Sequence, residues 1–97
     1  MRRAKLEIQI DILKVLSRHG PLKLTHIMYK ANVNCNVLRQ YLDFLIQQNL
    51  VEEQTLNKKR VVYAITERGR TILKYFREIS SALTLTEGAH KIPPLLY

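Results

Sequence analysis

The chain has 97 residues, of which 46% are hydrophobic, a size and composition typical of one globular domain with a modest core. Sixteen Lys and Arg residues against eight Asp and Glu residues give a net charge of +8, which favours a polyanionic partner such as DNA, RNA or anionic lipid. No apolar run approaches the roughly 20 residues of a membrane span. The start "MRRAKLEIQI" also lacks the cleavage site of a signal peptide, so we expect a cytoplasmic protein that does not bind a membrane.

Metal, redox and catalytic chemistry are not indicated by the residues. Cys35 is the only cysteine, which excludes an intramolecular disulfide, and we interpret it as a small residue early in a helix. His19, His26 and His90 do not have metal-ligand spacing. No glycine-rich phosphate loop or nucleophile–base set is present, and Ser80-Ser81 is interpreted as solvated helix surface. We therefore expect a protein that is not an enzyme and has no metal site or cofactor.

Residues 4–19 predict a first helix, although "LEIQIDI" alternates like a strand, because the apolar pattern is too long for a typical strand. The stop signal "SRHGP" follows, with basic residues, glycine and proline in the expected order. One apolar stripe includes Ile12, and a second stripe on nearly the opposite side consists of Leu6, Ile10 and Leu13. A helix that is apolar on two faces needs two packing partners, so the second stripe indicates another helix or another subunit.

Residues 22–31 and 34–49 predict two more helices, separated by the tight turn "NVN". Asn34 is a favoured N-cap residue for the second of them, and at the start of that helix it is also a candidate for a DNA contact. Val33 and Leu38 stand at the positions of a hydrophobic staple, which fixes how the chain enters the helix. Two helices joined by such a turn predict a helix-turn-helix.

The helix at 34–49 carries polar residues opposite its apolar stripe. Asn36, Gln40 and Asp43 lie on that side at 100° per residue, and Arg39 lies on the flank. Arginine pairs with guanine, and asparagine and glutamine pair with adenine, so this face is a candidate for base recognition. Asp43 either accepts from cytosine or holds Arg39 one turn away. The alternative is the solvated face that any surface helix has.

Two segments rich in β-branched residues, "LVEEQTL" and "VVYAIT", predict a hairpin with "NKKR" between them. Lys58, Lys59 and Arg60 make its tip basic, which would neutralise phosphates or reach a minor groove. The alternative is a tip that is merely solubilised by charge. Tyr63 and Ile65 share one strand face and are expected to point at the core.

The short helix at 22–31 supplies further candidates for phosphate contacts, because the first helix of a helix-turn-helix crosses the DNA backbone. Thr25, His26 and Lys30 lie on or near its exposed side. For His26 a neutral surface role is equally open.

A last helix is predicted at 67–85, with Thr66 as its cap. Its apolar residues recur at four-three-four spacing, which suggests a partner helix over a short length. With one flanking tyrosine, the stripe consists of Ile72, Tyr75, Phe76, Ile79 and Leu83.

The order of elements predicts an α+β, mainly α fold, a winged helix-turn-helix of three helices and a two-stranded wing with a C-terminal dimerisation helix. The expected division is 1–66 for the DNA-binding domain, 67–86 for the dimerisation helix and 87–97 for an irregular tail.

Three stretches resemble archaeal winged helix-turn-helix proteins, especially the small basic ten-kilodalton DNA-binding proteins of Sulfolobus and related predicted transcriptional regulators. They are "KLEIQIDILKVL", "HIMYKANVN…YLDFLIQQNLV" within residues 26–51, and "YAITERG" at 63–69. The second stretch is the most specific, and the third is common to many winged helices. The resemblance covers roughly residues 4–83.

The resemblance implies a recognition helix at 34–48, a wing at 55–61 and a homodimer whose last helices pair as an antiparallel coiled coil. Asn34 stands where the family usually has serine, which keeps the capping chemistry. The last helix breaks near Thr86, whereas the coiled coil of the family can run longer. We therefore expect a protein that binds double-stranded DNA, either as a transcriptional regulator or as a chromatin-associated protein of the nucleoid.

Two rival functions have distinct signatures. A winged-helix module for protein–protein interaction would present an apolar face on the helix at 34–49, where this chain has polar residues. RNA binding would favour exposed aromatic side chains, whereas most of the five Tyr and two Phe residues fall on apolar stripes.

Overall fold

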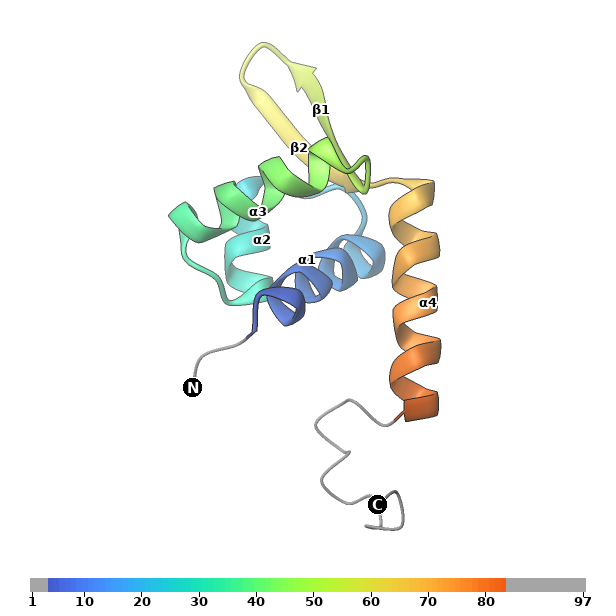
Figure 1. Ribbon diagram of the computed structural model, residues 1–97. Helices are drawn as coiled ribbons and strands as arrows, with labels where there is room; N and C mark the ends of the chain where they lie inside the picture. Colours follow the sequence, from blue (N-terminus) through green and yellow to red (C-terminus); the bar gives the residue numbers. More distant parts are fainter. Residues whose placement is uncertain (1–3, 84–97) are drawn as a thin grey trace.

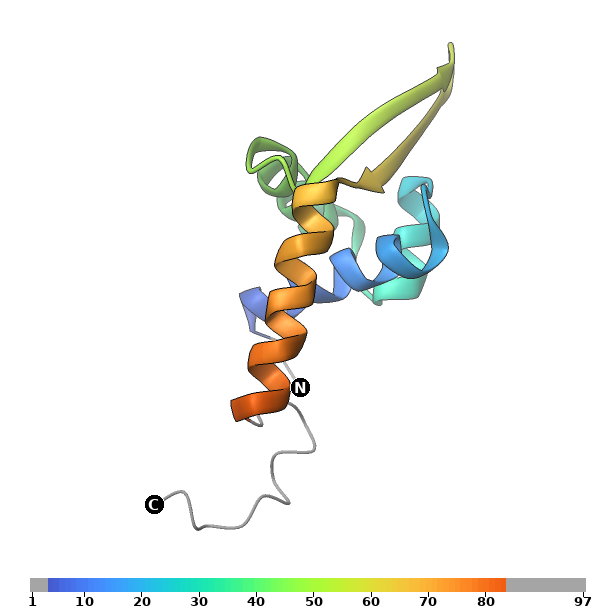
Figure 2. The ribbon, with the colours of Figure 1, turned by 90° about the vertical axis from the view of Figure 1, so that its right-hand side faces the viewer.

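The computed structural model of the chain describes residues 4–83, so the predicted tail at 87–97 and the predicted helical residues 84–86 lie outside the described residues. Three helices pack together, an antiparallel hairpin projects from them, and a fourth helix runs off in the opposite direction (Figure 1 and Figure 2). The predicted fold class and elements are confirmed, with small shifts at the element ends. The elements are α1 (Lys5–His19), α2 (Leu24–Ala31), α3 (Cys35–Gln47), β1 (Val51–Asn57), β2 (Arg60–Ile65) and α4 (Glu67–Leu83).

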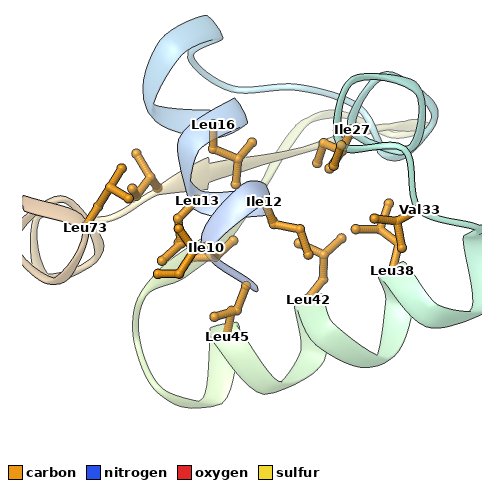
Figure 3. Close-up of a cluster of buried hydrophobic side chains, with 13 residues drawn as sticks. Ile10, Ile12, Leu13, Leu16, Ile27, Val33, Leu38, Leu42, Leu45 and Leu73 are labelled. Carbon is orange, nitrogen blue, oxygen red and sulfur yellow. The ribbon is translucent and has the colours of Figure 1, made fainter. Parts of the chain in front are cut away.

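Aliphatic side chains from all four helices and from the hairpin form one core (Figure 3). Each contributes about 1.5–3 kcal/mol relative to an exposed side chain, so this cluster is the main stabilising feature of the fold. Its most deeply buried members are Ile12, Leu13, Leu16, Ile27, Leu38, Leu42, Leu45, Val51 and Leu73.

The second apolar stripe of α1 is covered by α4 of the same chain, which is the first of the two alternatives left open by the sequence, another helix or another subunit. Ile10 and Leu13 are buried in the core, and Leu73 of α4 lies beside them (Figure 3). The stripe did need a second partner, but an intramolecular helix supplies it. Only Leu6 of the stripe remains exposed, at 59%. Leu73 also joins α4 to the common core across the predicted domain boundary at residue 66.

Local signals set the start of α3 as predicted. The Asn34 side-chain oxygen accepts a hydrogen bond from the backbone N–H of Val37 at 2.9 Å, which satisfies one free donor of the helix end. Val33 and Leu38 are both buried in the core, in keeping with the staple. Asn32 ends α2 in the left-handed conformation, with φ 56°, so the turn between the helices needs no glycine.

The hairpin is held to the helical body through β2. The backbone of Tyr63 exchanges two hydrogen bonds with Leu22, at 3.0 and 2.8 Å, in a bridge just before α2. Ile65 is buried as predicted, whereas Tyr63 is half-buried and packs against the core from its edge. Val62 and Ala64, on the alternate side of the strand, are also buried. Both sides of β2 are therefore covered here.

A network of hydrogen bonds joins the end of α3 to the start of α4. The Thr66 hydroxyl donates to the carbonyl of Asn49 at 2.7 Å and accepts from the N–H of Gly69 at 2.9 Å, so Thr66 caps α4 as predicted. The Thr66 N–H donates to the carbonyl of Leu50 at 3.0 Å, and Arg68 Nε donates to the carbonyl of Gln48 at 3.1 Å. We call these contacts the α3–α4 junction.

The side chains along α4 differ in their exposure to solvent. Ser80 is buried, which corrects its interpretation as solvated surface, while Ser81 is exposed. Tyr75, Ile79 and Leu83 are large side chains left exposed on this helix.

No helix in the described range combines the length and the apolar character needed to cross a bilayer.

Candidate nucleic-acid interface

The predicted recognition face of α3 is exposed to solvent. Asn36, Arg39, Gln40 and Asp43 are all exposed, while the opposite stripe is buried in the core. The apolar period of the helix separates the two faces cleanly, because burial of one stripe turns the polar residues outward. These four side chains are therefore free to meet a groove of DNA.

A groove of about 700 Å³ lies beside this face, lined by the segment that begins α2, by α3 and by the wing. Cations from all three line it: Lys23, Arg39, Lys59 and Arg60. Glu53 is the one carboxylate among its lining residues, so the groove carries a net positive charge. Such a convergence of cations suits the phosphate backbone of a nucleic acid.

Arg39 is positioned by residues of its own helix and by the wing. A hydrogen bond with the Cys35 side chain, one turn earlier, is the main cause that raises the pKa of Arg39. Tyr63 and Asp43 add to this effect, and Asp43 adds least. Both roles of Asp43, a contact with cytosine and a contact with Arg39, therefore stay predictions.

The three candidates on α2 do not lie together. Thr25 lines the groove described above, and His26 is exposed. Lys30 instead lines a separate hollow of about 450 Å³, shared with Arg18 and His19 of α1. Residues of one short helix can share a polar character and still face different neighbours, so only Thr25 is placed beside Arg39 and the wing.

The wing presents its cations as predicted, with the turn held by a side chain. Lys58, Lys59 and Arg60 are all exposed. The side-chain oxygen of Asn57 accepts a hydrogen bond from the N–H of Lys59 at 3.2 Å, an Asx-type turn. Lys59 and Arg60 line the groove, and Lys58 lies at the turn itself.

Several residues that line the groove were not predicted as contacts from the sequence, among them Lys23, Glu53 and Tyr63. Lys23 lies in a connecting segment without periodicity, so no pattern marked it. Glu53 pairs with Tyr63 across the hairpin, a neighbourhood that could have been found by counting outward from the predicted turn. Burial first and the Glu53 carboxylate second raise the pKa of Tyr63.

Aromatic side chains are more exposed than the apolar stripes suggested. Tyr29 on α2 is 81% exposed, and Phe44 and Tyr75 are also exposed. Tyr41 and Phe76 are half-buried against the core, as expected. Exposed rings of this kind are the feature that RNA binding favours, so RNA stays a rival partner.

Asn34 caps α3, and this limits the contacts that its side chain can make with DNA. Its side-chain oxygen is engaged in the cap of α3, which leaves only its amide hydrogens to reach outward.

Across the described residues 4–83, no group of His, Cys, Asp or Glu side chains is placed to hold a metal ion.

Residues 2–84 match the winged helix-turn-helix family. The chain belongs to this family. Sso10a-2, a DNA-binding protein from Sulfolobus solfataricus, is 31% identical, with 98% of each chain covered and a TM-score of 0.69. These matches confirm the resemblance to archaeal winged helix-turn-helix proteins of the Sulfolobus type.

Two further comparisons are more partial. A MarR family transcriptional regulator from Silicibacter pomeroyi has a TM-score of 0.73 at 16% identity, over 95% of this chain and 63% of that chain, which is a likeness of fold. An uncharacterised protein of Methanocaldococcus jannaschii is 30% identical over 79 residues, which make up 81% of this chain and 35% of that protein. The chain thus spans about a third of the length of this archaeal relative.

Proposed function

We propose that the chain binds double-stranded DNA, with α3 in the major groove and the wing along the flanking backbone. The observation that carries this proposal is the groove in which Arg39 of α3 lies with Lys59 and Arg60 of the wing and Lys23 before α2. A recognition helix and a wing that act on one duplex must present their cations on one side of the molecule. The net charge of +8 supports the same partner.

Each exposed residue has a proposed part in binding. Arg39 pairs with guanine, and Asn36 and Gln40 pair with adenine. Asp43 accepts from cytosine. Phosphates are contacted by the remaining set, Lys23, Thr25, Lys58, Lys59 and Arg60. His26 and Lys30 are also exposed, and as predicted from the sequence they are further candidates for phosphate contacts, Lys30 from a separate hollow.

We further propose that two copies associate through α4. Its exposed apolar side chains are Tyr75, Ile79 and Leu83, and Leu6 of α1 is exposed as well. Ile72 and Phe76 are half-buried and extend the same surface. A dimer would present two recognition helices to a duplex, the arrangement that winged helices use to read paired half-sites. The protein would then work in the cytoplasm, on the nucleoid, and without catalysis.

The relatives support a role in DNA binding without fixing the biological task. Sso10a-2 is described as a DNA-binding protein, and the chain covers nearly all of it. A regulator and a chromatin-associated protein differ in how far one site is preferred over others. Specific complexes are typically about 10³-fold or more tighter than non-specific ones, whereas a chromatin protein binds fragments alike.

The test is fluorescence anisotropy of labelled duplexes across a salt series, with random DNA and genomic fragments. Micromolar binding whose logarithm falls with log salt at a slope of several released ions is expected. Arg39→Ala should weaken a preferred site by about tenfold to a hundredfold, whereas Lys58→Glu with Lys59→Glu should weaken all duplexes alike. Arg77→Ala, an exposed arginine of α4, is the matched control and should change neither.

Two results would overturn the proposal. One is the absence of duplex binding at low salt, which would favour an interaction module for proteins. The other is unchanged affinity in both the Arg39 and the wing variants, which would place the duplex on another surface. Tighter binding of single-stranded RNA than of duplex DNA would support the exposed aromatic rings as stacking platforms instead.

A further inference from the structure

Leu56 is an exposed leucine next to the basic tip of the wing. Its side chain is 59% exposed, whereas the other large hydrophobic side chains of β1 and β2 are buried or half-buried. The hairpin that carries Leu56 projects away from the three packed helices (Figure 2). A single exposed leucine is ordinary on a protein surface, so what distinguishes Leu56 is its place beside the basic tip.

An irregularity in the strand pairing also falls at Leu56. Thr55 pairs with Val61 and Asn57 pairs with Arg60, so the register shifts between them and Leu56 has no partner in the ladder. A bulge of this kind bends the strand and redirects a side chain, and bulges concentrate beside functional sites. The irregularity falls on the one exposed apolar residue of the hairpin.

Three cations follow this leucine in the chain. Lys58, Lys59 and Arg60 follow within four positions, and Asn57 fixes the turn through its hydrogen bond with the N–H of Lys59. A partner at this tip must therefore tolerate an apolar side chain and attract positive charge. A second copy of the chain, with its own charge of +8, meets the second condition poorly.

A duplex meets both conditions, because its minor groove is bordered by phosphates and floored by stacked bases. We propose that Leu56 enters the minor groove and wedges against a base step, while Lys58, Lys59 and Arg60 bind the phosphates on either side. Apolar wedges of this type partly unstack one step. Pyrimidine–purine steps such as TA unstack most easily, so the wing selects flexible steps at the edge of the site.

This inference rests on the proposed DNA binding, and one experiment separates the two. Duplexes carry 2-aminopurine, whose fluorescence rises on unstacking, beside either a TA step or an A-tract at the wing position. Anisotropy reports affinity and its salt slope on the same samples. The wild-type chain is expected to raise the fluorescence at the TA step and to prefer that duplex by about tenfold.

The variants isolate the side chain. Leu56→Ala should lose the fluorescence change and the TA preference while it keeps the salt slope, and Leu56→Met should restore both because it is apolar and long. Thr55→Ala, its exposed neighbour on the same strand, is the control and should behave as wild type. Circular dichroism and a thermal scan establish that each variant is folded.

Four outcomes would overturn the wedge. Duplex binding with a normal salt slope but no fluorescence change in the wild-type chain would leave the proposed function standing and remove Leu56 from the bases. A fluorescence change that persists in Leu56→Ala would assign it to another residue. A change in oligomeric state caused by Leu56→Ala, with fluorescence unaltered, would make Leu56 a protein contact. Absence of any duplex binding would reject the proposed function first, and the wedge with it.

Discussion

Gly69, in the first turn of α4, is predicted to be the least replaceable glycine of the described chain. A Cβ atom there would lie 2.3 Å from the carbonyl oxygen of Leu50 and 2.7 Å from Cγ1 of Ile65, both closer than real side chains approach. The obstacle is a backbone carbonyl, which cannot rotate aside. Gly69→Ala must therefore push the start of α4 about an ångström away to reach ordinary contact, which begins at 3.4 Å.

The cost can be estimated from the contacts that this shift would break. The hydrogen bond from Thr66 N–H to the Leu50 carbonyl would be lost, at about 1 kcal/mol, and the bond from the Thr66 hydroxyl to Asn49 would cost about as much again. Looser packing around Leu73 adds about 1 kcal/mol. Alanine recovers up to about 1 kcal/mol through its higher helix propensity. The expected net loss of unfolding free energy is about 2 kcal/mol.

Gly20 provides the matched comparison, because its backbone conformation and not its neighbours limits substitution. It has φ 80° with nothing within 4 Å of an added Cβ, so Gly20→Ala meets backbone strain but open space. Its φ of 80° and ψ of −164° lie in a region that essentially only glycine occupies, so we expect a cost of about 1–3 kcal/mol. Urea denaturation followed by circular dichroism measures both variants. If Gly69→Ala is as stable as the wild type, the close approach of α4 to Leu50 does not exist in solution.

Two further predictions concern the wing and the last helix. Folding raises the pKa of Tyr63, so the stability contributed by its neutral phenol is complete below the unfolded value of about 10 and is lost as pH rises through the folded value. Unfolding free energy should therefore fall more steeply above about pH 10 in the wild type than in Tyr63→Phe, and equal slopes would contradict this. In analytical ultracentrifugation, Ile79→Glu should convert a dimer to a monomer, while Ser81→Glu, also exposed on α4, should leave it dimeric. Identical sedimentation of the two variants would rule out the α4 stripe as the interface.

The parts of the fold that were predictable depend on short-range chemistry. The cap of α3 by Asn34 and the cap of α4 by Thr66 each involve residues three positions apart, so a few letters of sequence contain the whole signal. The polar face of α3 follows from a helical period that places Leu38 and Leu42 inward. The basic wing tip follows from a turn flanked by two strands.

Other features depend on which elements meet, and periodicity does not specify this. The stripe of Ile10 and Leu13 was correctly identified as apolar, but the pattern could not distinguish α4 of the same chain from a helix of another. Lys30 and Thr25 share one helix yet face different hollows, because α1 lies on one side of α2 and the wing on the other. Glu53 entered the groove through strand pairing, a contact between distant residues.

The α3–α4 junction connects the end of the proposed recognition helix to the start of the helix proposed for dimerisation. Three hydrogen bonds run from residues 48–50 at the end of α3 to Thr66 and Arg68 at the start of α4, with Gly69 seated against Leu50. α4 is anchored at this end by the junction and farther along by Leu73 in the common core, so it is joined rigidly to the body that carries the recognition helix (Figure 1). In the proposed dimer, a small change in the angle between the two α4 helices would therefore move the two recognition helices through a larger distance. That angle would decide which spacing of half-sites the protein can span.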